Sequence, residues 1–297
     1  MKIGLQVVRF DWQGSPQNIG ARLAEIARTA DEVGFASLWV MDHFFQIDGG
    51  GMGHAEDPML EGYATLSFLA GVTKQVRLGT MVTGVNYRQP GFLVKQVSTL
   101  DVLSGGRAWL GIGAGWYERE AVGLGLPFPP LKERFERLEE TLQIAKQMWS
   151  GDVSPYNGVH YQLAEPINTP QPLTKPHPPI LIGSSGEKKG LRLVAQYADA
   201  CNLFAFGDSQ ALVQKLDVLK RHCDEVGRNY EDIERTVLTS FNAGEGGTDV
   251  ASVIEKCRGL AAIGIQHVIF SGVSNVHNLT PLELIGREII PAVAEFR

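Results

Sequence analysis

An aspartate and a histidine stand side by side at Asp42 and His43, directly after the apolar run 38–41. Such a run predicts a buried strand, so both side chains lie where that strand ends. An imidazole at this position titrates near neutral pH and can move a proton, and the neighbouring carboxylate can anchor a ligand by hydrogen bonds. The alternative interpretation is an aspartate that caps a turn beside a surface histidine.

Two glycine-containing segments also follow predicted strands. The first, 111–115, has the sequence Gly-Ile-Gly-Ala-Gly and lacks the Gly-x-Gly-x-x-Gly spacing of a dinucleotide-binding fold. Its glycines instead allow a planar ring or a phosphate to approach the backbone. The second, Gly183-Ser184-Ser185-Gly186, precedes a helix expected from Glu187. Free N–H groups and the helix dipole favour an anion there, so we predict phosphate binding; a simple capping turn is the alternative.

Several other kinds of site and partner receive no support. The seven histidines never fall at His-x-x-x-His spacing and the three cysteines form no Cys-x-x-Cys pair, so we predict no metal. The net charge of −6 comes without a basic patch, which argues against nucleic acid. The apolar run 3–8 is too short for a signal peptide, and no stretch approaches the ~18 apolar residues that span a bilayer. We therefore expect a cytoplasmic protein without a membrane partner.

Short apolar runs alternate with segments of helical period along the whole chain. The predicted strands are 3–8, 36–41, 76–83, 107–112, 179–182, 200–204, 235–241 and 267–270. The predicted helices are 16–33, 62–72, 90–103, 132–149, 187–197, 211–226, 250–263 and 282–293. Eight such units without a linker predict a single α/β domain over 1–297, a closed (β/α)8 TIM barrel with insertion loops. Long insertions at 46–60 and 151–178 are typical of functional loops.

The active sites of such barrels lie at the carboxyl ends of the strands. In the segments that this rule selects, the sequence resembles the luciferase-like family of flavin and deazaflavin oxidoreductases. The similarity covers nearly the whole chain and is closest to the F420-dependent oxidoreductase group. The most specific stretches are Leu38-Trp39-Val40-Met41-Asp42-His43-Phe44, Leu78-Gly79-Thr80-Met81-Val82-Thr83, 100–107, Gly113-Ala114-Gly115-Trp116 and Pro179-Ile180-Leu181-Ile182-Gly183.

The resemblance implies coenzyme F420 as the cofactor, with FMN as the alternative, and a role for each of these segments. Asp42 would bind the ring system and His43 would donate or accept a proton at its reactive face. The segment Thr80-Met81-Val82-Thr83 would bulge against the ring through a non-prolyl cis peptide at Met81-Val82. Gly113, Ala114 and Gly115 would pass close to the ring, and Gly183, Ser184, Ser185 and Gly186 would bind the phosphate.

The sequence departs from the family at the fourth strand, where members that oxidise sugar phosphates carry a glutamate and this chain has Trp116. Together with Phe44 and Tyr117, Trp116 predicts an aromatic-walled pocket for an apolar or planar substrate. Glu118 is a candidate for a second catalytic proton-transfer group, although it could equally cap a helix or face solvent.

The favoured function is hydride transfer between F420 and a small organic substrate. The first alternative is an FMN-dependent two-component monooxygenase, and the second is a non-catalytic flavin-binding protein. By analogy with barrels of this type, we expect a homodimer.

Overall fold

Eight parallel strands close into a ring in the computed structural model, which describes residues 1–49, 52–207, 209–241 and 249–296. β11 pairs with β1, with His267 opposite Lys2, and β3 pairs with β5, with Leu78 opposite Ala108. This confirms the predicted (β/α)8 barrel. In order around the ring the strands are β1 (Lys2–Val7), β2 (Ser37–Val40), β3 (Arg77–Thr80), β5 (Ala108–Gly113), β8 (Ile180–Gly183), β9 (Ala200–Phe204), β10 (Glu234–Ser240) and β11 (His267–Ser271).

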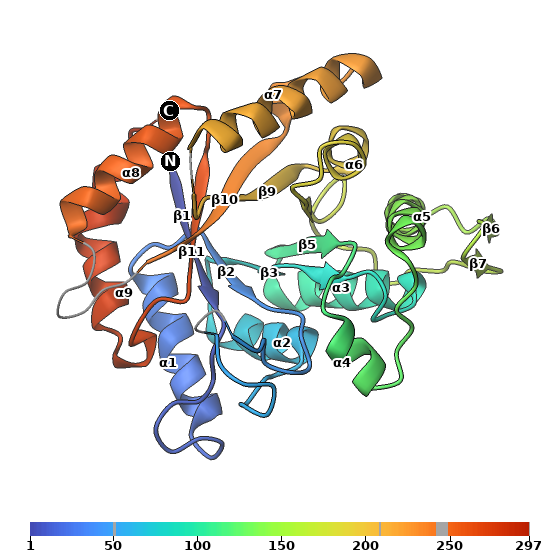
Figure 1. The fold of residues 1–297 in the computed structure, drawn as a ribbon. Helices are drawn as coiled ribbons and strands as arrows, with labels where there is room; N and C mark the ends of the chain where they lie inside the picture. Colours follow the sequence, from blue (N-terminus) through green and yellow to red (C-terminus); the bar gives the residue numbers. More distant parts are fainter. Residues whose placement is uncertain (50–51, 208, 242–248, 297) are drawn as a thin grey trace.

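Helices surround the ring, and the two chain termini lie close together (Figure 1). The helices that follow the strands are α1 (Ile19–Glu32), α2 (Gly62–Val72), α3 (Pro90–Ser104), α4 (Glu118–Gly123), α5 (Leu131–Ser150), α6 (Gly190–Tyr197), α7 (Ser209–Val226) and α8 (Val250–Ala262). The predicted last helix, 282–293, is instead three consecutive segments: α9 (Thr280–Leu284), a π-helical turn η3 (Ile285–Ile289) and α10 (Ile290–Val293). Short 3₁₀ turns, η1 (Tyr230–Asp232) and η2 (Val276–Asn278), complete the connections.

The third strand is interrupted rather than continuous over the predicted range 76–83. β3 ends at Thr80, the Met81-Val82 peptide is cis as the resemblance implied, and pairing with β5 resumes at β4 (Thr83–Gly84). A Cβ on Gly111 in β5 would lie 1.9 Å from the carbonyl oxygen of Thr80. Only glycine therefore lets β5 pass this close to the interruption.

The barrel interior is filled with side chains rather than open. Trp39 from β2 and Trp109 from β5 meet edge to face at 5.8 Å between ring centroids. Leu181, Leu238 and Ile269, from three other strands, belong to the same inner cluster. The larger apolar core lies between the outer face of the strands and the helices. A packed interior of this kind leaves the mouth at the carboxyl ends of the strands as the place for a ligand.

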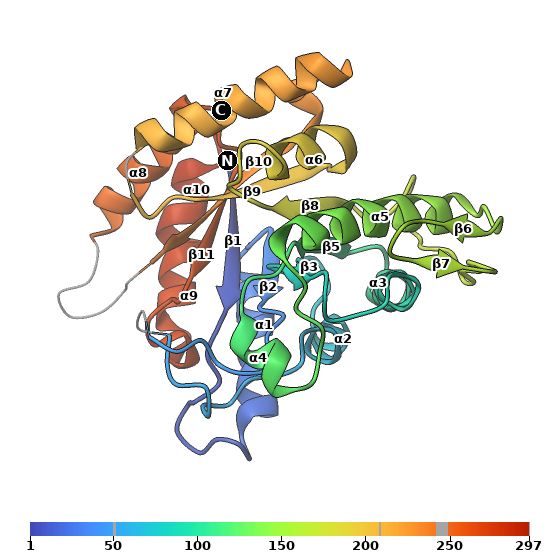
Figure 2. The same cartoon turned by 45° about the vertical axis from the view of Figure 1, so that its right-hand side comes forward.

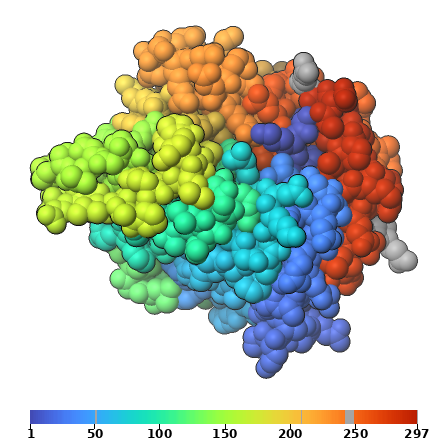
Figure 3. All heavy atoms as spheres, turned by 180° about the vertical axis from the view of Figure 1, so that it is seen from behind, coloured from blue at the N-terminus to red at the C-terminus, as the bar shows by residue number. Residues whose placement is uncertain are grey.

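The insertion 151–178 extends from the side of the barrel (Figures 2 and 3). It carries a two-stranded hairpin, β6 (Tyr156–Asn157) with β7 (Gln162–Leu163). The buried carboxylate of Glu140 in α5 accepts hydrogen bonds from the backbone N–H groups of Val159, His160 and Tyr161, which anchors the hairpin. The insertion leads into the amino end of β8. It therefore lies toward the amino end of the barrel, whereas the active site is expected at the carboxyl ends of the strands.

A cluster of interacting polar side chains lies at the amino end of the barrel. His267 in β11 contacts the Ser37 hydroxyl at 3.0 Å through Nε2 and the Glu234 carboxylate at 3.2 Å through Nδ1. Lys2 also pairs with Glu234, at 3.1 Å. Burial alone would raise the pKa of Glu234, but the hydrogen bond and charge of His267, together with Lys2, lower it to about 2.

The lowered pKa of Glu234 predicts an acid-sensitive contribution to stability. A carboxylate whose pKa is depressed by folding stabilises the protein above its unfolded-state pKa, and this contribution is lost as the pH falls toward its folded-state pKa. We expect Glu234→Gln to lower the free energy of unfolding at pH 7 by about 2–3 kcal/mol, and the difference from wild type to vanish between about pH 4.5 and pH 2. Urea unfolding at several pH values measures this. Glu25→Gln, which breaks the exposed pair with Arg22, is the control; an equal effect in both variants would contradict the prediction.

Candidate active site

His43 lies where β2 ends and is held by a buried carboxylate from α4. Its Nδ1 lies 2.5 Å from Oε1 of Glu120. The Glu120 carboxylate also accepts the backbone N–H groups of Phe44 at 2.6 Å and Phe45 at 3.1 Å, and the hydroxyl of Tyr87. Burial alone would raise the pKa of Glu120, but these contacts, above all His43, lower it. An ionised carboxylate can only accept hydrogen bonds, so Nδ1 carries the proton and Nε2 is left to exchange one.

The carboxylate bonded to His43 is Glu120, a residue that the sequence analysis did not single out. Glu118, the candidate that it named, is the first residue of α4 and its side chain faces solvent. Its role as a second proton-transfer group stays a prediction.

Asp42 is also buried, and it pairs with a residue that the sequence analysis did not single out. The Arg88 guanidinium donates to both of its carboxylate oxygens, at 2.6 and 2.8 Å, and also to Glu61. Arg88 lies over the ring of Tyr63, 4.8 Å from its centroid. Burial alone would lower the pKa of Arg88, but the charge and hydrogen bonds of Asp42 raise it. Asp42 is therefore not a free carboxylate at the mouth of the barrel, because both of its oxygens accept hydrogen bonds from Arg88.

Buried hydroxyl groups fix the residues on either side of the cis peptide. The Thr80 and Thr83 hydroxyls are buried and lie 2.7 Å apart, and the Tyr63 hydroxyl is 2.8 Å from that of Thr83. On the other side, the Gln6 amide donates to the Met81 carbonyl at 3.1 Å. Thr80 and Thr83 thus hold the Met81-Val82 bulge in place, while contact between this segment and the cofactor stays a prediction.

The side chain of Val82 leaves room only for glycine at two of the positions that the sequence analysis singled out. A Cβ on Gly183 would lie 2.8 Å from Val82 Cγ1, and one on Gly113 would lie 3.0 Å from Val82 Cγ2. Both contacts are closer than carbon atoms normally approach. The structure therefore brings the bulge and the ends of β5 and β8 together, with glycine required on either side of Val82.

The loop after β5 is fixed by two further residues that sequence reasoning missed. Gly115 has φ +73°, and a Cβ there would lie 2.4 Å from the Asn86 side-chain oxygen, so glycine is required. That oxygen is buried and has no hydrogen-bond partner in the described part of the chain. Arg134 in α5 donates to the carbonyl oxygens of Ala114, at 3.3 Å, and of Gly115.

The segment 183–186 forms an open loop at the carboxyl end of β8. Ser185 and Gly186 are exposed, and the Ser184 hydroxyl accepts the N–H of Gly186 at 3.3 Å. The helix after it begins at Gly190, three residues later than expected, because a turn intervenes. Lys215 in α7 approaches the loop and donates to the Ser185 carbonyl at 2.8 Å. Small side chains beside a cation suit an anionic group.

Aromatic rings gather around His43. Trp116 stacks on Tyr117 with ring centroids 5.1 Å apart, and the imidazole of His43 meets each of them edge to face at 5.7 Å. Phe44 packs edge to face on Tyr87 at 5.1 Å. Trp116 remains 60% exposed. The structure thus brings the three predicted pocket residues together beside the histidine.

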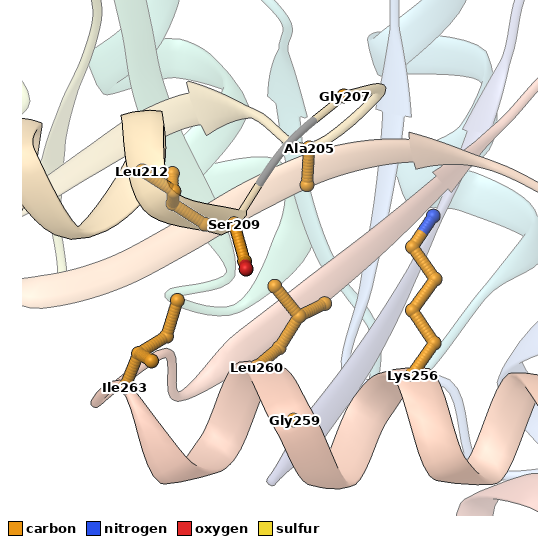
Figure 4. Close-up of a pocket in the computed structure, with 8 residues that line it drawn as sticks. All are labelled: Ala205, Gly207, Ser209, Leu212, Lys256, Gly259, Leu260 and Ile263. Carbon is orange, nitrogen blue, oxygen red and sulfur yellow. The ribbon is translucent and has the colours of Figure 1, made fainter.

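Two cavities lie near the carboxyl ends of the strands. The larger, about 850 Å³, opens where β1, β10 and β11 end. The smaller, about 280 Å³, lies between α7 and α8 (Figure 4). Lys256 lines the smaller one, and its amine donates to the Thr239 hydroxyl at 2.6 Å. Among the residues that the structure describes, no cluster of histidine, cysteine or acidic side chains could hold a metal, and no helix is long and apolar enough to cross a bilayer.

Comparison with known proteins assigns this arrangement to a family. The family model for luciferase-like monooxygenases matches residues 1–276. The F420-dependent glucose-6-phosphate dehydrogenase of Nakamurella multipartita is 30% identical over 288 residues, which cover 93% of this chain and 78% of that protein.

Solved structures share the fold at lower identity. The F420-dependent tetrahydromethanopterin reductase of Methanopyrus kandleri matches with a TM-score of 0.81 and 17% identity, over 100% of this chain and 99% of that one. The oxygenating constituent of 3,6-diketocamphane monooxygenase from Pseudomonas putida, in complex with FMN, matches with a TM-score of 0.75 and 18% identity, over 98% of each chain.

Proposed function

Because this chain belongs to the luciferase-like monooxygenase family, we propose that it is an oxidoreductase that transfers a hydride between coenzyme F420 and an organic substrate. The observation that carries the proposal is the buried Glu120–His43 pair at the carboxyl end of β2. β2 and β3 are neighbours, with Val40 opposite Thr80, so His43 and the cis peptide follow adjacent strands. The similarity to F420-dependent dehydrogenases supports the choice of coenzyme.

The residues at the mouth fit a phosphorylated deazaflavin. The open loop 183–186 and the amine of Lys215 would hold its phosphate. Val82 and the backbone of 113–115 would face its ring, because the strands close tightly around Val82. When bound, F420 supplies a two-electron carrier of hydride.

The protein's own part in the reaction is positioning and proton transfer. Glu120 fixes the tautomer of His43, so that Nε2 gives the substrate a proton or takes one from it. Trp116 and Tyr117 pack edge to face against the ring of His43. We further propose that these rings, with Phe44, contact an apolar or planar part of the substrate.

A flavin monooxygenase is the second candidate. The observation that favours it is the shared fold of the FMN-containing 3,6-diketocamphane monooxygenase constituent. Ring and phosphate sites of the same shape would serve both cofactors. Oxygen consumption with supplied reduced FMN would support this candidate over the first.

Titration of the apo protein with F420 and with FMN, following ring fluorescence, separates the candidates. We expect tight binding of F420 and weak binding of FMN. Lys215→Met is expected to weaken F420 binding, by about tenfold, because it removes the cation beside the phosphate loop. Lys220→Met, on an exposed position of the same helix, is the matched control. A preference for FMN would move the assignment to a monooxygenase, and binding of neither cofactor would refute the proposed function.

A further inference from the structure

We propose that the cavity of about 850 Å³ at the ends of β1, β10 and β11 is the substrate site. It selects an uncharged substrate because Arg9, the one lysine or arginine among its described lining residues, is neutralised by Asp11. The inference rests on the proposed function in taking the occupant to be the substrate. The lining comes from strand ends other than those that precede Phe44 and Trp116, so these rings would contact only the part of the substrate that extends toward His43. The volume is within the range of small-molecule sites, and the position is the one that barrel enzymes use.

Two hydrogen bonds connect this cavity to the site already described. Gln6, in its wall, donates to the Met81 carbonyl of the cis peptide at 3.1 Å. Val8, also in its wall, accepts from the Gln46 amide at 2.9 Å, and Gln46 lies three residues after His43. The cavity wall is therefore held directly to the bulge and to the loop that carries the histidine. β11 pairs with both β1 and β10, so the three strands that lead into the cavity lie side by side in the barrel (Figure 1).

The cavity combines aromatic surface with hydroxyl groups. Trp12 lies on one side, and Phe206, which is 58% exposed and stacks on Phe204, lies on another. Ser240 and Ser271, at the ends of β10 and β11, also line it. Such walls suit a ligand with a planar apolar body and hydroxyl or carbonyl groups.

The charges of the lining residues argue against an anionic substrate. Among the described lining residues, Arg9 is the only lysine or arginine, and its guanidinium donates twice to Asp11, with Nε at 3.0 Å. The hydrogen bonds from Arg9 lower the pKa of Asp11, so the carboxylate is ionised at neutral pH. Among the described lining residues, the Arg9–Asp11 pair therefore leaves no lysine or arginine charge uncompensated that could bind a phosphate ester.

Calorimetric titration with a matched pair of ligands, 2-naphthol and 2-naphthyl phosphate, tests this selection with and without F420. We expect wild type to bind 2-naphthol at least about tenfold more tightly. Asp11→Asn should free Arg9 and strengthen binding of the phosphate by about tenfold, with 2-naphthol unchanged. Because Arg9 and Asp11 form a surface ion pair, the substitution should cost little stability. Glu25→Gln removes one negative charge far from the cavity and should change neither affinity. Phe206→Ala should weaken both ligands.

Three results would overturn the inference: a wild-type preference for the phosphate, an Asp11→Asn variant that behaves like Glu25→Gln, or no binding of either ligand to wild type. Failure of the proposed function looks different. If F420 does not bind but the two naphthyl ligands show the expected dependence on Asp11, the cavity selects uncharged ligands and the coenzyme assignment alone is wrong.

Discussion

Replacement of Arg88 by methionine is expected to lower the free energy of unfolding by about 3–5 kcal/mol. Methionine keeps the aliphatic part of the side chain, but the guanidinium over Tyr63 is lost together with the charge. The substitution leaves Asp42 buried with both carboxylate oxygens deprived of their donors. A buried charge without a partner is among the most destabilising changes in a folded protein. Urea unfolding at pH 7 measures the effect.

Two further variants show whether the buried pair is the cause. Arg22→Met breaks the exposed pair with Glu25 and should cost less than about 1 kcal/mol. Combining Arg88→Met with Asp42→Asn removes the unpaired charge and should recover part of the loss, since partners in one ion pair are not additive. Equal destabilisation by Arg88→Met and Arg22→Met would show that the buried pair does not stabilise the fold.

Arg88 also shows why part of this site was invisible in the sequence. The alternation of apolar runs and helical segments was sufficient to predict the barrel, because parallel strands buried on both faces have a recognisable composition. An arginine in a loop after a strand has no such signature. It becomes a site residue only because β2, β4 and α2 converge, so that Asp42 and Glu61 both reach its guanidinium.

The glycines illustrate a second limit. The sequence marked Gly113 and Gly183 as positions of close approach and assigned that approach to the cofactor, which stays a prediction. The structure shows a second reason for glycine, because the side chain of Val82, at the cis peptide, lies against both positions. Spacing shows where a side chain is not tolerated, and only the tertiary structure shows what takes its place.

Glu120 was overlooked for a simpler reason. The sequence analysis predicted no helix between 113 and 131, and α4, with six residues, is too short to show a helical pattern. Residues two apart on a helix point about 200° apart, so only the structure shows that Glu120, and not Glu118, reaches His43.

Replacement of His43 by asparagine is expected to lower kcat by about 10²–10⁴-fold, the range that a positioned acid or base contributes. Asparagine keeps a polar group near Glu120 but has no ring nitrogen that can give or take a proton. F420 affinity, measured by ring fluorescence, should stay close to that of wild type, because the phosphate loop lies on β8 rather than β2. Turnover is followed by ring absorbance with the alcohol or carbonyl compound that gives the highest wild-type rate.

Glu120 should act through His43, and a double substitution tests this. Glu120→Gln alone is expected to reduce kcat and to shift the pH dependence of kcat. The reason is that a neutral amide replaces the charged carboxylate beside Nδ1. In the His43→Asn background the same change should cost almost nothing further, since residues that act as a unit are strongly non-additive. Additive losses would make Glu120 an independent group. Full turnover by His43→Asn would instead place the proton transfer elsewhere in the mouth and leave the Glu120–His43 pair a structural feature of the β2–α4 contact.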